Sequence, residues 1–260
     1  MKVVKWISTI LLTFASTLVF AQPSAPSVTG TTPTNNTKPT WNWTSGGGGN
    51  GTFRYKLDDN DLTSGTTETT DLFYTPATDL LEGNHTLYVQ ETDGTNWSTS
   101  GSYTITIDLT PPTITDVIVP NSPMKVNDIV TATITVSDDS GDTYTLNSGN
   151  INGFSLSGLS RTNSTTYTAS FTVTEAGTDI PAGSDIPLSV VLTDGAGNNN
   201  TAYTSSISQN NDAIDANSPS ITNVTIPNLP MKVNDIVTAT ITVSDDNGDT
   251  YTLNSGNING

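Results

Sequence analysis

The residues best suited to chemistry in this chain are acidic side chains grouped in loops. Asp138, Asp139 and Asp142 fall within five positions and are separated by Ser140 and Gly141. Carboxylate oxygens at this density are the ligands that calcium prefers. The spacing is not that of an EF-hand, because the glycine is misplaced and the late glutamate is absent. The alternative is a hairpin turn with Gly141 at positive φ and solvated acids.

A second acidic group lies on the approach to a junction near residue 218. Its members are Asp194, Asn198, Asp212, Asp215 and Asn217. Crowded carboxylates repel one another unless a cation lies between them, so we expect calcium to stiffen this junction. The group partly resembles the cadherin linker, although the consecutive Asn-Asp-Asn run of that linker is absent. The alternative is that these are only solvated turn residues. No other cofactor is expected.

Tryptophans are the second kind of candidate binding residue. Trp97 lies in a loop, and we expect it to bind a ligand by stacking on a sugar ring. The alternative is that it folds back over the end of the sandwich. Trp41 and Trp43 are two positions apart and therefore share one face of a strand. That face could be a platform for a sugar. A sandwich core also needs a large ring at this place, and we interpret both residues as core.

The sequence offers almost no side chains for nucleophilic catalysis or zinc binding. The chain has no cysteine and one histidine, His85. His85 alternates with Leu87 and Val89, which indicates a hydrogen-bonded, partly buried ring, and no catalytic partner is specified by spacing. An acidic chain supplies pairs of carboxylates by chance, so none is singled out for glycoside hydrolysis. We therefore expect no enzymatic activity.

Short strands must position all of these residues. Apolar residues alternate with threonine or serine along residues 103–107, 130–136 and 167–173. This period of two, with β-branched residues on the wet face, is typical of half-buried antiparallel strands. One sheet cannot bury such apolar rows alone, so two sheets must pack. The sequence therefore predicts an all-β fold made of antiparallel sandwiches.

A long internal repeat sets the domain organisation. A stretch of 42 residues begins at Pro112 and again at Pro219, 107 positions later, and 36 of its positions are identical. A period of this length is one whole domain. We predict sandwich domains over residues 22–110 and 111–217, with the start of a truncated third repeat over residues 218–260.

The first 21 residues and the net charge bear on the compartment. Lys2 and Lys5 precede an apolar run over residues 7–20, and Ala21 fits the rule for a signal-peptide cleavage site before Gln22. The formal net charge of −17 repels nucleic acid and anionic membrane surfaces. We therefore expect a secreted or bacterial cell-surface protein. Its mature chain should neither bind nucleic acid nor insert into a membrane.

Several stretches resemble bacterial Ig-like modules. In the first unit they are residues 38–43 (KPTWNW), 53–58 (FRYKLD), 82–91 (EGNHTLYVQE) and 107–112 (IDLTPP), and in the second, residues 190–198 (VVLTDGAGN). The resemblance implies tandem Ig-like β-sandwiches. It also implies that Leu87 takes the place of a cysteine of antibody-type domains, so that apolar packing replaces the disulfide.

Such repeats are found in large surface and secreted proteins, and the resemblance implies a non-catalytic spacer or adhesive stalk. The alternative is an accessory, carbohydrate-binding region of a larger secreted carbohydrate-active enzyme. The expected partners are the neighbouring Ig-like repeats of the same chain and a cell-surface glycan or protein.

Overall fold

A computed structural model describes residues 22–137, 139, 141–244 and 251–258 of the chain. The expected signal peptide, residues 1–21, and Asp138 lie outside these described residues. Regular structure in the described part consists of β-strands, and it includes no helix that is long and apolar enough to cross a membrane. The predicted all-β class is confirmed. Two compact units divide the chain between Asp108 and Leu109.

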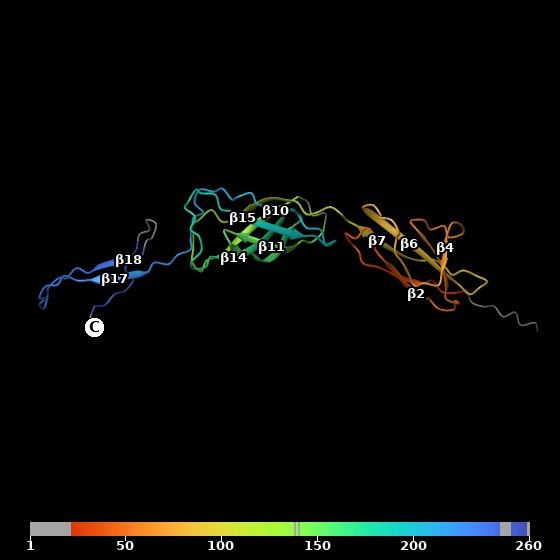
Figure 1. Ribbon diagram of the computed structural model, residues 1–260, viewed down its shortest axis with the longest axis horizontal. Helices are drawn as coiled ribbons and strands as arrows, with labels where there is room; N and C mark the ends of the chain where they lie inside the picture. The colour runs from red at the N-terminus through yellow and green to blue at the C-terminus, as the bar shows by residue number, and fades with distance from the viewer. Residues whose placement is uncertain (1–21, 138, 140, 245–250, 259–260) are drawn as a thin grey trace, which may run out of the picture. The chain divides into compact units, whose positions relative to one another are not determined.

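The first unit is a sandwich of two antiparallel sheets, drawn in red to yellow in Figure 1. One sheet has the strand order β1-β2-β5 and the other has the order β4-β3-β6-β7. The strands are β1 (Ser27–Thr29), β2 (Trp41–Thr44), β3 (Thr52–Leu57), β4 (Thr67–Thr69), β5 (Phe73–Tyr74), β6 (Gly83–Thr92) and β7 (Gly101–Ile107).

Both sheets of the first unit contribute to one apolar core. Trp41 and Trp43 project from β2 into this core with exposed fractions of 0% and 2%, so their interpretation as core residues is confirmed. Leu87 from β6 is equally buried in the same cluster. The indole Nε1 of Trp41 donates to the carbonyl of Tyr103 at 3.0 Å, which satisfies its buried polar atom. Aromatic volume thus fills the space between the sheets of a chain that has no cysteine.

The second unit contains a second sandwich, drawn in green to cyan in Figure 1. One sheet has the order β13-β14-β10-β8, a second has the order β12-β11-β15, and β9 and β16 form a short parallel pair. The strands are β8 (Ile114–Ile118), β9 (Met124–Lys125), β10 (Ile129–Val136), β11 (Thr145–Ile151), β12 (Phe154–Ser155), β13 (Ser157–Asn163), β14 (Thr166–Thr172), β15 (Leu188–Thr193) and β16 (Ile214–Asp215).

The alternation that predicted β10 and β14 decides what they bury. Val130, Ala132, Ile134 and Val136 all face the core, and the threonines between them face outward. β10 pairs with β14 so that Ala132 lies opposite Ala169. A slip of one residue would turn the entire apolar row to solvent, so the core fixes this register.

The third segment, drawn in blue in Figure 1, forms a two-stranded antiparallel sheet. Its strands are β17 (Ile221–Thr225) and β18 (Thr240–Val243). The apolar residues of this segment are largely exposed, whereas most of those of β8 and β10 are buried. The two stretches have nearly the same sequence but differ in how far their apolar residues are buried.

Candidate functional site

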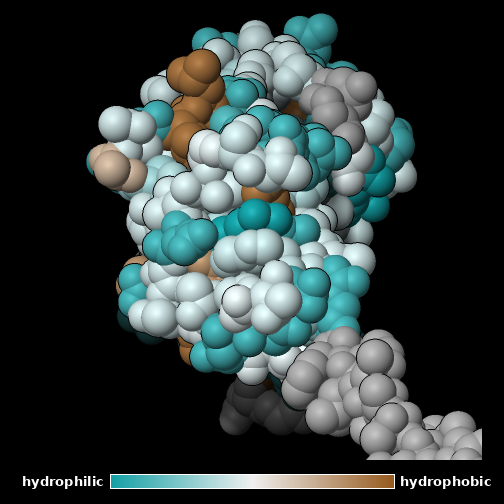
Figure 2. All heavy atoms as spheres, turned by 90° about the vertical axis from the view of Figure 1, so that its right-hand side faces the viewer, coloured by the Kyte–Doolittle hydropathy of each residue, from teal (hydrophilic) through white to brown (hydrophobic). Residues whose placement is uncertain are grey.

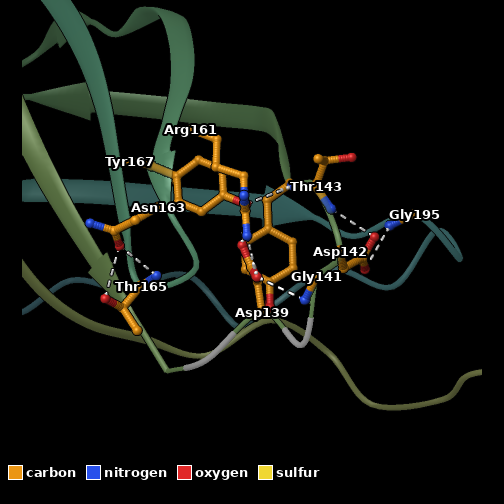
Figure 3. A network of polar contacts seen from close by, with 10 residues as sticks. Asp139, Gly141, Asp142, Thr143, Arg161, Asn163, Thr165, Tyr167 and Gly195 are labelled. Atoms are coloured by element: carbon orange, nitrogen blue, oxygen red, sulfur yellow. Dashed lines mark hydrogen bonds and ion pairs between the residues drawn. The ribbon is translucent and has the colours of Figure 1, made fainter.

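The acidic loop that follows β10 is held by an ion pair inside the second sandwich. Arg161, on β13, donates from Nε to Oδ2 of Asp139 at 2.7 Å and from Nη2 to Oδ1 at 2.9 Å. The hydroxyl of Tyr167 donates to Oδ2 at 2.8 Å, and the amide of Gly141 donates to Oδ1 at 3.0 Å. Figure 3 shows these side chains converging on one carboxylate. Gly141 has the expected positive φ, at 88°.

These contacts keep Asp139 ionised. The hydrogen bonds from Arg161 outweigh the opposing effect of burial and, with those from Tyr167 and Gly141, hold the pKa of Asp139 well below its usual range. Tyr144 stacks on Tyr167, with 5.4 Å between ring centroids, and burial followed by the charge of Asp139 raises its pKa to about 12. The loop is therefore fastened to two strands by a carboxylate, a guanidinium and a phenol. A guanidinium at this distance also repels a second cation, so Asp139 offers little to calcium.

The loop after β15 is built around Asp194. Its Oδ1 accepts hydrogen bonds from the amides of Ala196, Gly197 and Asn198 at 2.8–3.0 Å, and its Oδ2 accepts one from the Asn198 side chain at 2.9 Å. Asp142 approaches from the other acidic loop, and its Oδ2 accepts from the Gly195 amide at 3.2 Å. A carboxylate that caps its own turn satisfies backbone donors that would otherwise be orphaned.

The structure brings two of the expected calcium ligands together. A carboxylate oxygen of Asp142 and one of Asp194 lie within 4.8 Å of each other. Both belong to the second unit and lie at the end of the sandwich where Thr145 faces Thr193. Calcium binding by Asp138, Asp139, Asp142, Asp194 and Asn198 stays a prediction, with Asp142 and Asp194 the best placed of the described members.

The expectation that Asp194 and Asn198 share a site with Asp215 and Asn217 is wrong. Asn217 donates to the carbonyl of Gly177 at 3.3 Å, at the opposite end of the sandwich, where Ile151 faces Leu188. The length of β15 separates the two ends by about 17 Å. The ligands of one calcium ion lie within about 2.6 Å of it, so no single ion joins the two groups.

Among the described residues, Asp212 is the one buried acid at that far end. It is 0% exposed, its Oδ2 accepts from Nε2 of Gln209 at 3.3 Å, and its Oδ1 has no hydrogen-bond partner among the described residues. Asp215 instead accepts from the Asn217 amide at 3.2 Å. Binding of calcium by Asp212, Asp215 and Asn217 at the junction stays a prediction.

Trp97 lies partly exposed beside the outer face of β3 and β6 in the first unit. The guanidinium carbon of Arg54 is 4.3 Å from the centroid of its ring, a cation–π contact. Arg54 also donates from Nε to the side-chain oxygen of Gln90 at 2.8 Å. One face of the indole is therefore covered by a cation, and ligand binding by Trp97 stays a prediction.

His85 is hydrogen-bonded and partly buried, as the alternation of β6 predicted. Its Nδ1 lies 2.7 Å from Oδ2 of Asp58 and its Nε2 lies 2.9 Å from the carbonyl of Leu81. Burial lowers its pKa, but the hydrogen bonds to Asp58 and Leu81 more than offset this, so the pKa is raised overall. Both ring nitrogens face acceptors, so the charged ring satisfies both contacts at once. The ring therefore ties the start of β6 to two neighbouring turns.

Sequence reasoning did not identify Arg161 or Glu91 as organising residues. Arg161 is the only arginine in the second unit, which was the one available signal. Glu91 is 1% exposed and accepts from the hydroxyl of Ser45 at 2.5 Å and from the amide of Gly51 at 3.2 Å. It sits beneath the glycine-rich loop that joins β2 to β3, on the same face of β6 as Leu87 and Val89, and a charged residue at that position gave no hint of burial.

No protein-family model matches the sequence, and no curated protein matches it. Among solved structures, the fibronectin(III)-like modules of CbhA from Clostridium thermocellum align with a TM-score of 0.44 at 15% identity, covering 73% of this chain and 94% of that chain. The FN1–FN3 domains of chicken CNTN1 align with a TM-score of 0.36 at 15% identity, covering 73% and 69%. A two-domain fibronectin type III segment of chicken tenascin aligns with a TM-score of 0.28 at 9% identity, covering 73% and 100%.

The strand orders of the two units carry the structural conclusion. Each unit packs two mainly antiparallel sheets over one core, as fibronectin type III and Ig-like domains do. This architecture hosts many unrelated functions. The chain is therefore composed of tandem β-sandwich modules of the fibronectin type III-like or Ig-like kind.

Proposed function

We propose that this chain is a non-catalytic spacer or adhesive region of an exported bacterial protein. The observation that carries the proposal is that sandwich modules follow one another in tandem with a near-identical repeat. A string of self-contained modules gains reach with each unit, and its role depends little on the surface of any one of them.

The placement of the reactive side chains supports this reading. Asp139 is paired with Arg161, Asp194 caps a turn, and His85 bridges two turns of the first unit. Each of these groups acts on the protein's own backbone or on a neighbouring side chain. The face drawn in Figure 2 is mostly hydrophilic or neutral, with hydrophobic atoms in separate small areas, as expected of a region that remains in solvent.

The pattern of residues 1–21 supports export to the cell surface or medium. N-terminal sequencing of the protein recovered from outside the cell tests this part of the proposal. A mature chain that begins at Gln22 supports it. Retention of the uncleaved chain in the cytoplasm contradicts it.

The spacer role is tested by the distance between the two units in solution. Cysteines introduced at the exposed Ser64 and Thr201 carry a donor and an acceptor dye, since the chain has no cysteine of its own. A short, proline-containing junction should give a narrow distribution of dye distances. A ten-residue Gly-Ser insertion after Thr110 is the control, and it should broaden the distribution. An equally broad distribution without the insertion would argue against a spacer.

An accessory carbohydrate-binding role is the second candidate. It is favoured by the group formed by Trp97, Arg54 and Gln90, which places an indole, a guanidinium and an amide side by side on a sheet face. Aromatic rings with neighbouring hydrogen-bonding groups suit sugar rings. Binding to a glycan panel that is lost in Trp97→Ala and kept in Tyr88→Ala would support it. If no glycan of the panel binds, the carbohydrate-binding role is excluded and the spacer role is the candidate that remains.

A further inference from the structure

Arg54 is a cation of the first unit that forms no ion pair with any acid of the described residues. Other cations of the chain do have acidic partners: Nζ of Lys56 lies 2.7 Å from Asp59, and Nε of Arg161 lies 2.7 Å from Asp139. The chain holds 25 acids against 8 lysines and arginines. An unneutralised guanidinium on such a chain calls for an explanation in its surroundings.

Glu68 is the acid best placed to neutralise Arg54, but the guanidinium contacts other groups. The two residues face each other across β3 and β4, so their side chains leave adjacent positions on the same face of the sheet. The guanidinium carbon instead lies 4.3 Å from the ring centroid of Trp97, and Nε donates to Oε1 of Gln90 at 2.8 Å. Gln90 is the residue opposite Arg54 on β6, the strand on the other side of β3. Two uncharged groups therefore fix the position of the cation.

The polar atoms left without partners around this guanidinium are all hydrogen-bond donors. Nε of Arg54 is occupied by Gln90, whereas Nη1 and Nη2 have no partner in the described part of the chain. A guanidinium can only donate, so it faces the oxygen of Gln90, and Nε2 of Gln90 is left as a further donor without a described partner. The indole Nε1 of Trp97 can also only donate, and it has no described partner either. A ligand for this group must therefore supply acceptors.

A carboxylate matches this group of donors best. The planar guanidinium presents a fork of N–H groups whose spacing fits the two oxygens of a carboxylate, and the opposite charges strengthen both hydrogen bonds. The contacts with Trp97 and Gln90 already restrict the side chain of Arg54, so little conformational freedom is lost when a ligand binds. The group is therefore preorganised for one negatively charged acceptor.

The acids of the first unit limit which carboxylate ligands can approach. Residues 22–108 contain ten acids and three lysines and arginines. A densely charged polyanion is therefore repelled. A largely neutral polymer with isolated carboxylates avoids most of this repulsion, because the Debye length is about 8 Å at physiological ionic strength. Polysaccharides with spaced uronic-acid residues are such polymers, and their hydroxyl and ring oxygens supply further acceptors for Gln90 and Trp97.

We propose that Arg54, Gln90 and Trp97 form a binding site for a uronic-acid residue of an otherwise neutral polysaccharide. The carboxylate accepts hydrogen bonds from Nη1 and Nη2 of Arg54. Neighbouring sugar oxygens accept from Nε2 of Gln90 and Nε1 of Trp97. Glu68, opposite Arg54 on β4, opposes the bound carboxylate, which keeps each contact weak and reversible. The site rests on the carbohydrate-binding role proposed above and adds to it the class of sugar.

Polysaccharides with and without carboxylates test this site in the mature chain. Glucuronoxylan carries spaced uronic acids on a neutral backbone, and reduction of its carboxyl groups to alcohols gives a matched neutral polymer. Isothermal titration calorimetry at physiological ionic strength should show binding of the native polymer and about tenfold weaker binding of the reduced one, because the hydrogen bonds to a charged group are lost. Equal binding of the two would overturn the site but leave a carbohydrate-binding role intact. Absence of binding to the native polymer would overturn the site, and the glycan panel decides separately on the wider role.

Variants of the charged residues make the test specific to this site. Arg54→Gln should weaken binding of native glucuronoxylan about tenfold and leave binding of the reduced polymer unchanged. Glu68→Gln should strengthen binding of the native polymer several-fold, a gain that a misfolded chain cannot produce. Lys38→Gln removes a cation that pairs with Asp79 and is the control, with unchanged affinity expected. Equal affinities of the parent chain, Arg54→Gln and Glu68→Gln would refute the proposal.

Two further ligands separate the sugar from other carboxylates. Polygalacturonate, which carries a carboxylate on every residue, should bind more weakly per carboxylate than glucuronoxylan, because the acids of the first unit repel it. A tetraglutamate peptide should not compete with glucuronoxylan. Tighter binding of polygalacturonate, or competition by the peptide at equal carboxylate concentration, would overturn the assignment to an isolated uronic acid.

Discussion

At the scale of single residues, several acidic side chains of this chain bind other groups of the protein itself. Asp139 was expected either to bind calcium, which stays a prediction, or to be a solvated turn residue, which its burial contradicts. It is 2% exposed and shares a bidentate contact with Arg161. The sequence separates the pair by 22 positions, and the pairing of both β10 and β13 with β14 brings them together. Spacing along the chain carries no information about such a contact.

Removing this carboxylate should destabilise the second sandwich. Asp139→Ala leaves the guanidinium of Arg161 and the hydroxyl of Tyr167 without their acceptor, and we expect the unfolding midpoint of the second unit to fall by about 5 °C or more. Thermal unfolding followed by circular dichroism measures this. Asp116→Ala removes an exposed acid of the same unit and serves as the matched control. Equal midpoints for the two variants would contradict the structural role.

The same carboxylate predicts behaviour in acid. Its pKa is depressed in the folded state, so its contribution is fully present above the unfolded value of about 3.9 and is lost as the pH falls through the folded pKa. The midpoint difference between the parent chain and Asp139→Ala should therefore persist at neutral pH and shrink below about pH 4. A difference that grew in acid would contradict this sign.

His85 predicts the opposite dependence on pH in the first unit. Its folded pKa is raised, so its contribution is fully present below the unfolded value of about 6.5 and is lost as the pH rises through the folded pKa. The chain has no other histidine, so His85→Gln should remove the loss of stability between about pH 6 and 8. Midpoints measured across this range test the prediction. An unchanged profile in the variant would assign the pH dependence to another group.

Calcium is the remaining prediction at this scale. If an ion binds between Asp142 and Asp194, calcium should raise the unfolding midpoint of the second unit relative to chelator, by mass action. Asp142→Asn should weaken the response, and Asp215→Asn, at the other end of the sandwich, should not. The same midpoint in calcium and in chelator would remove the site from consideration.

At the scale of elements, strands with strict alternation were predictable, and some of the others were not. β10, β14 and β7 follow from apolar and threonine residues in turn, and these are confirmed. β11 and β13 were not predicted, because Gly149, Gly158 and several serines and asparagines interrupt the alternation of apolar and polar residues. Both strands also contain irregular register where they pair with their neighbours. Their position is set by the strands beside them rather than by local preference.

Residue type and spacing also predicted only part of the candidate sites. The turn at Gly141 and the burial of Trp41 and Trp43 follow from residue type and period, and they were predicted. Which end of the sandwich each acidic loop occupies depends on the path of β15, which spacing cannot give. The assumed site that joined Asp194 to Asn217 failed for this reason.

The glycine-rich loop between β2 and β3 allows a sharp prediction. A Cβ on Gly49 would lie 2.2 Å from the side-chain carboxyl carbon of Glu91, so alanine must displace a buried group. We expect Gly49→Ala to lower the stability of the first unit by about 1–3 kcal/mol, the usual range for overpacking. Denaturant unfolding measures it. Gly256→Ala, where the nearest atom lies at 3.5 Å, is the control, and equal stabilities would show that the loop adapts freely.

At the scale of the whole molecule, the chain consists of modules that repeat. The first and second units each bury a core of their own, and the repeat reproduces the first half of the second unit almost unchanged. Near-identity lets the number of units change without redesign of any one of them.

Single-molecule force spectroscopy of the mature chain tests the central claim, that the chain carries independent modules which resist extension. Each sandwich should unfold in its own step, with length gains of about 30 nm for the first unit and somewhat more for the second, since an extended chain spans about 3.3–3.6 Å per residue. Residues beyond 218 should extend without a step. One merged step, or extension of the whole chain without resistance, would contradict the account.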